Sequence, residues 1–342
     1  MVLRKKLRVL VVEDSLFFRE VLVQGIESDG GIEVVGTAGD PYEARDKIIS
    51  LKPDVVTLDV EMPRMSGIEF LQKLIPQYPL PVVMVSAANT RVFDAINAGA
   101  VDFVRKPESK SPDDLKIFFN EINMKIKIAS TAKLKQAVSS MNAATRTMQG
   151  HTSSADYVIA IGASTGGTEA LYSVLKQFPS NTPGVVIVQH MPPVFTKMYA
   201  DRLNNSFDFE VKEAEDGDVI KAGRVIIAKG GVQMKVVKRQ NNYYVKVFEG
   251  EKVSGHCPSV DVLFQSVAEA VRDKAVGVIL TGMGTDGAKG LLEMKKNGAF
   301  TVGQDEASSI VYGMPKVAYN IGAVEVQCSL DDVAHTVFKY LK

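Results

Sequence analysis

Residues 161–167 read IGASTGG, a glycine-rich turn between two stretches of different periodicity. The residues before the turn, Tyr157–Ile161, form a short apolar run typical of a buried strand, and the residues after it, Glu169–Gln177, have a helical pattern. A buried strand that passes through glycines into a helix is the repeating unit of doubly wound α/β folds. This stretch therefore predicts an α/β fold for the second half of the chain.

The alternation of strands and helices continues on the C-terminal side of this turn. Further strands are predicted at Gly184–Gln189, Val225–Ala228 and Val276–Thr281. Between them, Met234–Val237 and Tyr243–Phe248 flank a polar turn and predict a β-hairpin. We expect a mostly parallel, doubly wound α/β domain with an antiparallel hairpin.

The first half of the chain shows the same alternation in a smaller unit. Five apolar runs, each followed by a helical pattern, predict strands at residues 7–12, 32–38, 54–58, 81–85 and 101–104. Runs that are apolar on both faces suit parallel strands covered by helices on both sides. We therefore expect a doubly wound, five-stranded sheet with a flavodoxin-like order.

A change in composition separates the two halves. From Ile122 to Ala155 the chain contains no Asp or Glu, and residues 139–154 lack periodic apolar side chains. With 342 residues the chain has room for two domains, so we expect domains at residues 1–125 and 155–342 joined by a linker at 126–154. A basic membrane-binding helix is the alternative for this segment, but it lacks aromatic anchors.

The overall composition excludes several classes of protein. Lys plus Arg number 40 and Asp plus Glu number 40, so there is no basic field for nucleic acid. Two cysteines cannot build a disulfide framework or a four-cysteine metal site, which indicates a reducing compartment. The apolar run near the start ends at Glu13-Asp14 and is too short for a signal peptide. We expect a soluble, cytoplasmic, monomeric protein that does not insert into membranes.

Carboxylates gather at the carboxyl ends of the predicted strands in the first domain. Glu13 and Asp14 end the first strand and Asp59 ends the third. Carboxylates in one cleft repel unless a cation neutralises them, and an all-oxygen set suits Mg²⁺. Helix capping is the alternative role for such residues. Ser86 and Lys106 close the fourth and fifth strands and could donate to a phosphoryl group on Asp59.

Residues 5–125 resemble a response-regulator receiver domain. The resemblance is carried by Glu13, Asp14, Asp59, Ser86 and Lys106, together with the Pro-x-x-x-Gly turn in Met62–Gly67. The resemblance implies that Asp59 is the phosphoacceptor. It implies that Mg²⁺ is held by Glu13, Asp14, Asp59 and the backbone carbonyl of Glu61, and that Ser86 and Lys106 contact the phosphoryl group.

The glycine-rich turn of the second domain fits two chemistries. It could cradle a dinucleotide pyrophosphate, or it could present Ser164 as a nucleophile in a Gly-x-Ser-x-Gly turn. Ser164 stands where a dinucleotide fingerprint has its second glycine, so its side chain would crowd a pyrophosphate. A helix-capping role for Ser164 is the simplest alternative.

A nucleophilic serine needs a base and an orienting carboxylate. His190 directly follows the strand at Gly184–Gln189, on the sheet edge expected for Ser164, and is a better candidate than His256. Asp286 lies in the glycine-rich loop after Thr281 and could reach the histidine from there. Alternatively, Asp286 could cap the helix that starts near Ala288.

The chain order Ser, His, Asp differs from the Ser, Asp, His order of α/β-hydrolases with a Gly-x-Ser-x-Gly turn. From Asp156 onward the sequence resembles the catalytic domain of the chemotaxis protein-glutamate methylesterases, the CheB family. The resemblance is carried by residues 162–167, 189–191, 258–264, 276–287, 306–308 and 313–315. It implies Ser164 as nucleophile, His190 as base, Asp286 as its orienting residue, and oxyanion donation from the amides of Thr165 and Met283.

One loop departs from the family pattern. The chain has His256-Cys257 where such enzymes often have His-Arg, so one charged contact to an acidic substrate is missing. Cys257 is not a candidate nucleophile, because no glycine turn presents it.

The combined resemblance implies a phosphorylation-activated enzyme of receptor adaptation. It would hydrolyse glutamate γ-methyl esters on methyl-accepting chemotaxis receptors, releasing methanol, and deamidate selected receptor glutamines. Its phosphodonor would be a CheA-type histidine kinase, Mg²⁺ would serve the receiver, and ester hydrolysis would need no cofactor. In the unphosphorylated state the receiver would cover the serine site. A dinucleotide-dependent oxidoreductase, a DNA-binding regulator and an inactive adaptor are the alternatives.

Overall fold

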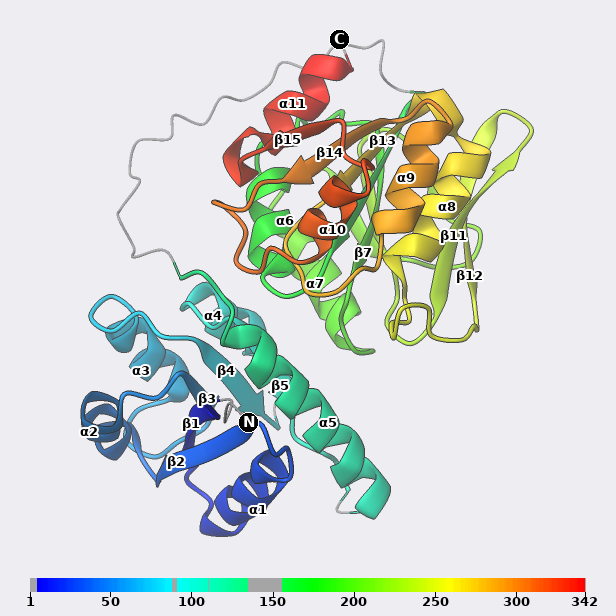
Figure 1. Ribbon diagram of the computed structural model, residues 1–342. Helices are drawn as coiled ribbons and strands as arrows, with labels where there is room; N and C mark the ends of the chain where they lie inside the picture. Colours follow the sequence, from blue (N-terminus) through cyan, green and yellow to red (C-terminus); the bar gives the residue numbers. More distant parts are fainter. Residues whose placement is uncertain (1–4, 88–90, 110, 135–155, 342) are drawn as a thin grey trace. The chain divides into compact units, whose positions relative to one another are not determined.

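The computed structural model describes residues 5–87, 91–109, 111–134 and 156–341 (Figure 1). The chain divides into two compact units, residues 1–141 and 142–342. Helix α5 (Pro112–Ala129) extends into the segment 126–154 predicted as a linker. Residues 135–155 of that segment lie outside the described part of the chain.

The first unit is built on a parallel five-stranded sheet with the order β2-β1-β3-β4-β5. The strands begin and end within one residue of their predicted positions: β1 (Leu7–Val12), β2 (Ile32–Ala38), β3 (Val55–Asp59), β4 (Val82–Ser86) and β5 (Asp102–Arg105). The described helices before α5 are α1 (Leu16–Glu27), α2 (Pro41–Leu51), α3 (Gly67–Leu74) and α4 (Val92–Asn97).

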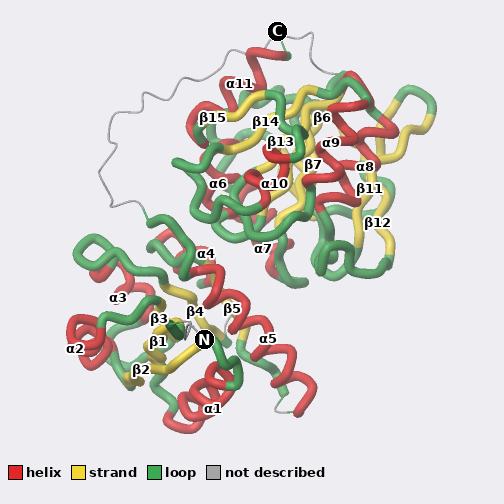
Figure 2. Tube along the Cα trace, in the orientation of Figure 1, coloured by secondary structure: helices red, strands yellow, loops and turns green. Residues whose placement is uncertain are grey.

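Helices lie on both faces of this sheet (Figure 2). Helix α1 packs beside α5, while α3 contacts both α2 and α4. Every residue of β3 and β4 is buried, which is why these strands read as continuous apolar runs. The strand order reverses between β1 and β3, so the ends of these two strands flank the position where ligands bind in such sheets.

The second unit has a parallel seven-stranded sheet with the order β15-β14-β13-β6-β7-β10-β8. Its strands are β6 (Val158–Ala163), β7 (Gly184–Gln189), β8 (Glu210–Glu213), β10 (Arg224–Ile227), β13 (Ala275–Ile279), β14 (Phe300–Gln304) and β15 (Val326–Cys328). Its α-helices are α6 (Gly167–Leu175), α7 (Phe195–Asn204), α8 (Val260–Ala270), α9 (Ala288–Lys296), α10 (Met314–Asn320) and α11 (Val333–Tyr340).

A small antiparallel sheet accompanies the large one. The predicted hairpin is present as β11 (Gln233–Arg239) and β12 (Asn242–Phe248), and β9 (Val219–Ile220) adds a third strand. The hairpin packs on α8 through buried side chains that include Met234, Val236 and Val245. The fold class predicted for the second domain is therefore confirmed, with a larger sheet than the sequence alone indicated.

In the sheet, β6 has β7 as its neighbour on one side and β13 as its neighbour on the other side. Strands β6 and β13 are neighbours, so the strand order reverses between them. The carboxyl ends of β6, β7 and β13 thus form the expected ligand-binding edge of this unit. Ser164 and His190 directly follow β6 and β7, and the loop with Asp286 follows β13.

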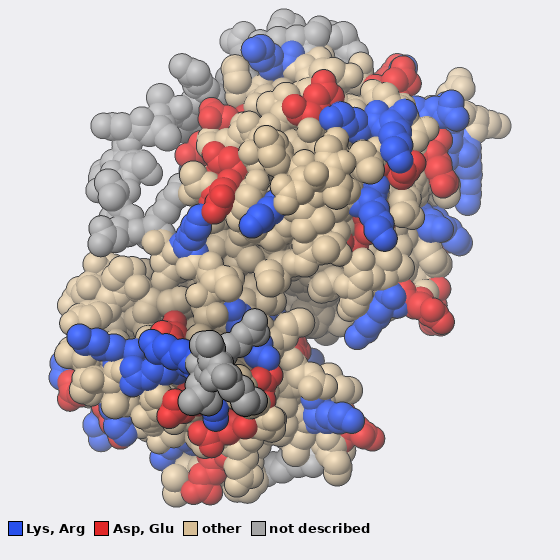
Figure 3. All heavy atoms as spheres, in the orientation of Figure 1, with Lys and Arg blue, Asp and Glu red and all other residues tan. Residues whose placement is uncertain are grey.

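Two surface features bear on the classes of protein considered above. None of the described helices combines the length and hydrophobicity needed to cross a bilayer. On the face shown in Figure 3, basic and acidic side chains are interspersed, in keeping with the equal numbers of the two charges in the sequence. That face offers no extended basic field for nucleic acid.

Candidate functional sites

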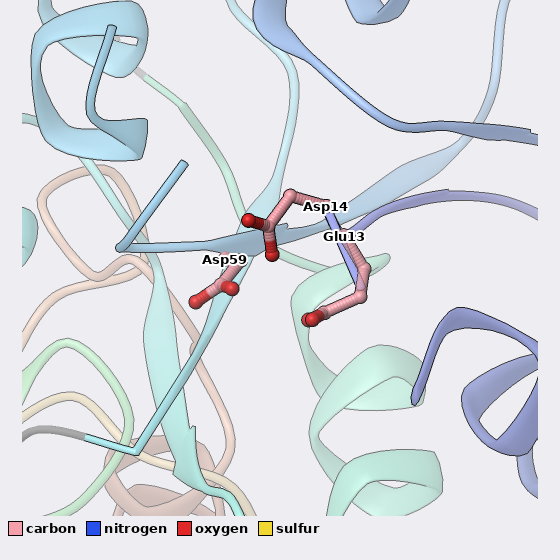
Figure 4. Close-up of side chains that lie close together, drawn as sticks. All are labelled: Glu13, Asp14 and Asp59. Atoms are coloured by element: carbon pink, nitrogen blue, oxygen red, sulfur yellow. The ribbon is translucent and has the colours of Figure 1, made fainter. Parts of the chain in front are cut away.

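Three carboxylates meet at the reversal point of the first sheet. Glu13 and Asp14 follow β1, and Asp59 is the last residue of β3 (Figure 4). Each offers an oxygen that lies within 4.8 Å of the others. Glu13 and Asp59 are buried and Asp14 is exposed, so the cluster has one open side. The structure brings together the three side chains that the sequence predicted as a metal site.

Lys106 provides positive charge beside the buried carboxylates. Its Nζ lies 2.8 Å from Asp59 Oδ2 and 2.8 Å from Glu13 Oε2. Burial and the neighbouring Asp59 carboxylate raise the pKa of Glu13 from 4.5 to about 7. Burial also raises the pKa of Asp59, although hydrogen bonding to Lys106 opposes this effect. One ammonium group is therefore not enough to hold both carboxylates fully ionised.

This shortfall of positive charge fits a divalent cation. The available donors are hard oxygen atoms, which Mg²⁺ prefers, and a cation would relieve the repulsion that raises the pKa of Glu13. Helix capping does not account for the cluster, because the caps of α1 and α3 are the hydroxyls of Ser15 and Ser66.

The other predicted residues of the first unit also lie at this edge. Ser86 is the buried last residue of β4, and its carbonyl accepts a hydrogen bond from the Lys106 N–H at 2.8 Å. The Glu61 N–H donates to Asp59 Oδ1 at 3.3 Å. Gly67 closes the Pro-x-x-x-Gly turn, and a Cβ there would lie 1.9 Å from the Asp59 carbonyl oxygen, so this turn requires glycine.

In the second unit, neighbouring residues hold the main chain of Ser164. Its N–H donates to the Thr281 carbonyl at 3.0 Å, and its carbonyl accepts from Gln189 Nε2 at 2.9 Å. A Cβ on Gly282 would lie 2.6 Å from the Cβ of Ser164, so only glycine fits there. The N-cap of α6 is Gly166, and no side chain caps this helix. The capping role considered for Ser164 is therefore excluded.

His190 and Asp286 form a buried pair next to Ser164. The N–H of His190 donates to the Ala163 carbonyl at 3.1 Å, so His190 and Ser164 lie on adjacent strand ends. His190 Nε2 is 2.8 Å from Asp286 Oδ2, with side chains only 7% and 1% exposed. His190 Nδ1 is buried and has no hydrogen-bond partner among the described residues. The Asp286 carboxylate thus selects the tautomer in which Nδ1 carries a lone pair.

Asp286 does not cap α9, the alternative considered from the sequence, because Gly287 is the N-cap of that helix. Instead it accepts hydrogen bonds at the start of α8, from the N–H of Val260 at 2.8 Å and the N–H of Asp261 at 3.0 Å. The Ser259 hydroxyl adds a third bond at 2.7 Å. Burial alone would raise the pKa of Asp286, but hydrogen bonds from His190 and Ser259 outweigh it and hold the pKa below its usual range.

Two backbone amides border the serine. Thr165 follows Ser164 directly, and Met283 follows Gly282, the residue in contact with Ser164. The Met283 side chain is 44% exposed, and its N–H donates to no acceptor in the described part of the chain. Both predicted oxyanion donors therefore lie in the loops beside Ser164.

Sequence reasoning missed the residues that hold this pair in place. Ser259 is the N-cap of α8 and bonds to Asp286, and the helix-start pattern at Pro258–Asp261 was the available signal for it. The ring of His256 stacks on His190, a contact between distant loops that no local pattern reveals.

Comparison with known proteins identifies both units. Residues 159–337 match the family model described as CheB methylesterase, and residues 9–120 match the model described as response regulator receiver domain. Neither matched model describes a dinucleotide-binding or DNA-binding domain.

Curated relatives match along nearly the whole chain. A Syntrophomonas wolfei protein named protein-glutamate methylesterase/protein-glutamine glutaminase 2 is 57% identical over 339 residues, covering 98% of both chains. A Syntrophotalea carbinolica protein named protein-glutamate methylesterase/protein-glutamine glutaminase is 53% identical, again covering 98% of both.

A solved structure extends the similarity to three dimensions. The Thermotoga maritima CheB methylesterase catalytic domain is 34% identical to this chain, with a TM-score of 0.53, and the match covers 54% of this chain and 98% of that one. The two family models, together with the sequence identity to the relatives and the share of the chain that they cover, show that the chain belongs to the CheB methylesterase family and carries a response regulator receiver domain.

Proposed function

We propose that the protein hydrolyses glutamate γ-methyl esters on chemotaxis receptors, with Ser164 as nucleophile, His190 as general base and Asp286 as the residue that orients the base. The observation that carries this proposal is the buried pair of His190 and Asp286, which leaves the second ring nitrogen of His190 without a partner among the described residues. His190 and Ser164 directly follow the neighbouring strands β7 and β6. The names of the relatives support the choice of substrate.

The reaction starts with transfer of the hydroxyl proton of Ser164 to Nδ1 of His190. The serine oxygen attacks the γ-carbonyl carbon of the ester and forms a tetrahedral intermediate. The imidazolium of His190 stays paired with Asp286, whose low pKa keeps it ionised while the proton is held. His190 then gives the proton to the departing methoxy group, which leaves as methanol.

Water completes the cycle by the same route. His190 takes a proton from water, the resulting hydroxide attacks the acyl-enzyme, and the proton returns to the Ser164 oxygen as glutamate is released. In both halves the intermediate carries an oxyanion. We assign its stabilisation to the amides of Thr165 and Met283, because both lie in the loops that enclose Ser164.

The same attack on a receptor glutamine would release ammonia in place of methanol. Deamidation therefore needs no further catalytic group, and the glutaminase in the relatives' names supports this second reaction.

We further propose that Asp59 is the phosphoacceptor of the receiver unit and that a CheA-type histidine kinase is its phosphodonor. Glu13, Asp14, Asp59 and the carbonyl of Glu61 would hold Mg²⁺, which neutralises charge on the incoming phosphoryl group. Lys106 and Ser86 would donate to the oxygens of the phosphorylated residue. Phosphorylation activates the esterase in this proposal.

The esterase assignment is tested by methanol release from receptor membranes methylated with a labelled methyl group. The full chain is compared with Ser164→Ala. The variant is expected to lose roughly 10⁴- to 10⁶-fold in turnover. Methanol release by Ser164→Ala at the rate of the unsubstituted chain would contradict the assignment.

A further inference from the structure

The most unusual contact around the catalytic pair is a stack of two histidine rings. The centroids of His190 and His256 lie 3.6 Å apart, and their planes differ by 6°. Neither ring nitrogen of His256 hydrogen bonds to a described residue, so its ring contributes a face and not a donor or acceptor.

The backbone holds His256 firmly in this place. Val253 and His256 exchange two hydrogen bonds, at 3.0 and 2.9 Å. The carbonyl of His256 also accepts from the side chain of Gln233 at 3.4 Å. Gln233 is buried and accepts from the N–H of Ser259 at 2.9 Å, which links this loop to the start of α8. The ring is therefore anchored to the same helix start that holds Asp286.

The environment keeps His256 uncharged. Burial, assisted by the neighbouring His190 and by Lys252 and opposed by Asp286, lowers the pKa of His256 to about 4. At neutral pH a neutral ring therefore lies against His190. When His190 takes up the serine proton, that neutral face meets a cation, an arrangement that aromatic faces favour.

His190 needs such a support. Among the described residues, the ring hydrogen bonds to Asp286 alone, through Nε2, so this bond by itself leaves the side chain free to rotate and change the direction of Nδ1. A parallel ring at contact distance limits this rotation, because a tilt of His190 would drive its atoms into those of His256.

We propose that His256 is a positioning residue: its stacked ring restrains the orientation of the His190 ring, so that Nδ1 can take the proton of Ser164, and it supports the imidazolium during proton transfer. This inference rests on the function proposed above. It differs from a role of His256 as the base, which would require proton transfer through a ring nitrogen.

The test compares His256→Ala with His256→Phe in the full chain. Phenylalanine keeps a flat ring but cannot transfer a proton. His335→Ala is the matched control, because His335 is an exposed histidine on α11. Two readouts are used: the rate at which a small fluorophosphonate labels Ser164, and kcat and KM for methanol release.

We expect His256→Ala to lower both the labelling rate and kcat by about 10- to 100-fold, the range typical of a misplaced catalytic group. KM should change little, since His256 acts through His190. His256→Phe should recover most of the loss, and His335→Ala should behave like the unsubstituted chain.

Two results would overturn the proposal. The first is a His256→Ala variant that reacts with the fluorophosphonate and releases methanol at the rates of the unsubstituted chain. The second is a His256→Phe variant that is as impaired as His256→Ala although its thermal unfolding matches that of the unsubstituted chain. Labelling needs no receptor. Normal labelling of the unsubstituted chain without methanol release would therefore refute the proposed function and leave the stacking test intact.

Discussion

The carboxylate of Asp286 accepts four hydrogen bonds, two on each oxygen. Oδ2 accepts from His190 Nε2 and the Val260 N–H, and Oδ1 accepts from the Ser259 hydroxyl and the Asp261 N–H. All four partners donate when Nε2 carries the proton, so only a group with two acceptor oxygens satisfies them. Asp286 thus both orients the histidine and ties the end of β13 to the start of α8.

Asp286→Asn should therefore damage activity and stability together. An asparagine has one acceptor oxygen, and its NH₂ group would face either His190 and Val260 or Ser259 and Asp261. We expect a loss of about 10⁴-fold in kcat, because the favoured histidine tautomer is lost, and a lower melting temperature. Methanol release and thermal unfolding measure the two effects. Wild-type turnover in the variant would contradict the assigned role of Asp286.

The raised pKa of Glu13 predicts pH-dependent metal binding in the receiver unit. With a pKa of about 7, Glu13 is largely protonated in mild acid, and Mg²⁺ must displace that proton. Mg²⁺ affinity should rise roughly tenfold between about pH 6 and about pH 8, as expected when one proton is displaced. Titration calorimetry would measure this. Glu13→Gln should bind more weakly and lose most of the pH dependence, and a pH-independent affinity in the unsubstituted chain would contradict the interpretation.

At the scale of elements, the loop after β13 packs on the turn after β6, and Gly282 is the point of contact. A Cβ there would approach Ser164 Cβ to 2.6 Å and the sulfur of Met314 to 2.5 Å. The methionine can move, but the main chain of Ser164 is held by hydrogen bonds from both sides.

Gly282→Ala should displace Ser164 and lower kcat by about 100-fold, as a shift of about 1 Å in a catalytic group can do. Fluorophosphonate labelling of Ser164 and methanol release would both report it. Gly30→Ala is the control, since a Cβ on Gly30 meets no atom within 4 Å and its backbone is not in the left-handed region. Full activity of Gly282→Ala would show that the loop can move away from the serine.

Most elements with strong apolar runs were predictable from the sequence, and short or polar ones were not. The buried strand β14, with the sequence FTVGQ, was also not predicted, because Thr301, Gly303 and Gln304 break its apolar run. All five strands of the first sheet were predicted to within one residue. Strands β3 and β4 are buried throughout and give apolar runs, whereas β2 and β5 are only partly buried and were marked by their Val34-Val35 and Phe103-Val104 pairs. In the second unit, β8 has the sequence EVKE and β15 only three residues, and both lie at sheet edges. These two strands are short and bury few residues, so their sequences carry a weak signal.

Some residues of the candidate sites could be predicted from the sequence, and others could not. Asp59, Ser164 and His190 could be predicted because each is the last residue of a strand or directly follows one, and parallel strands bring such positions to one edge. The helix start at Ser259 had a local signal, but its bond to Asp286 and the stacking of His256 on His190 had none, because both contacts depend on how the loop before α8 folds against a different strand end.

At the level of the whole molecule, the chain joins a response regulator receiver domain to a CheB methylesterase domain in two compact units. The catalytic domain of a Thermotoga maritima relative has a solved structure that matches the second unit. If the receiver restrains the esterase until Asp59 is phosphorylated, removal of the receiver must release that restraint.

A chain reduced to residues 156–342 should therefore have a higher basal rate of methanol release than the unphosphorylated full chain. Coupling free energies between sites are typically about 1–3 kcal/mol, equivalent to a factor of about 5 to 150 in an equilibrium, and we expect a gain of this order. The shortened chain should also ignore phosphodonors. A folded catalytic unit that is no more active than the full chain would argue against restraint by the receiver.

Methanol release from methylated receptor membranes tests the proposed esterase and its activation by phosphorylation together. It is measured for the full chain, Ser164→Ala and Asp59→Asn. Each is assayed with and without a small-molecule phosphodonor and Mg²⁺. We predict that the full chain is stimulated by the phosphodonor, that Asp59→Asn keeps the basal rate without stimulation, and that Ser164→Ala is inactive in both conditions. Stimulation that persists in Asp59→Asn, or release that persists in Ser164→Ala, would contradict the account.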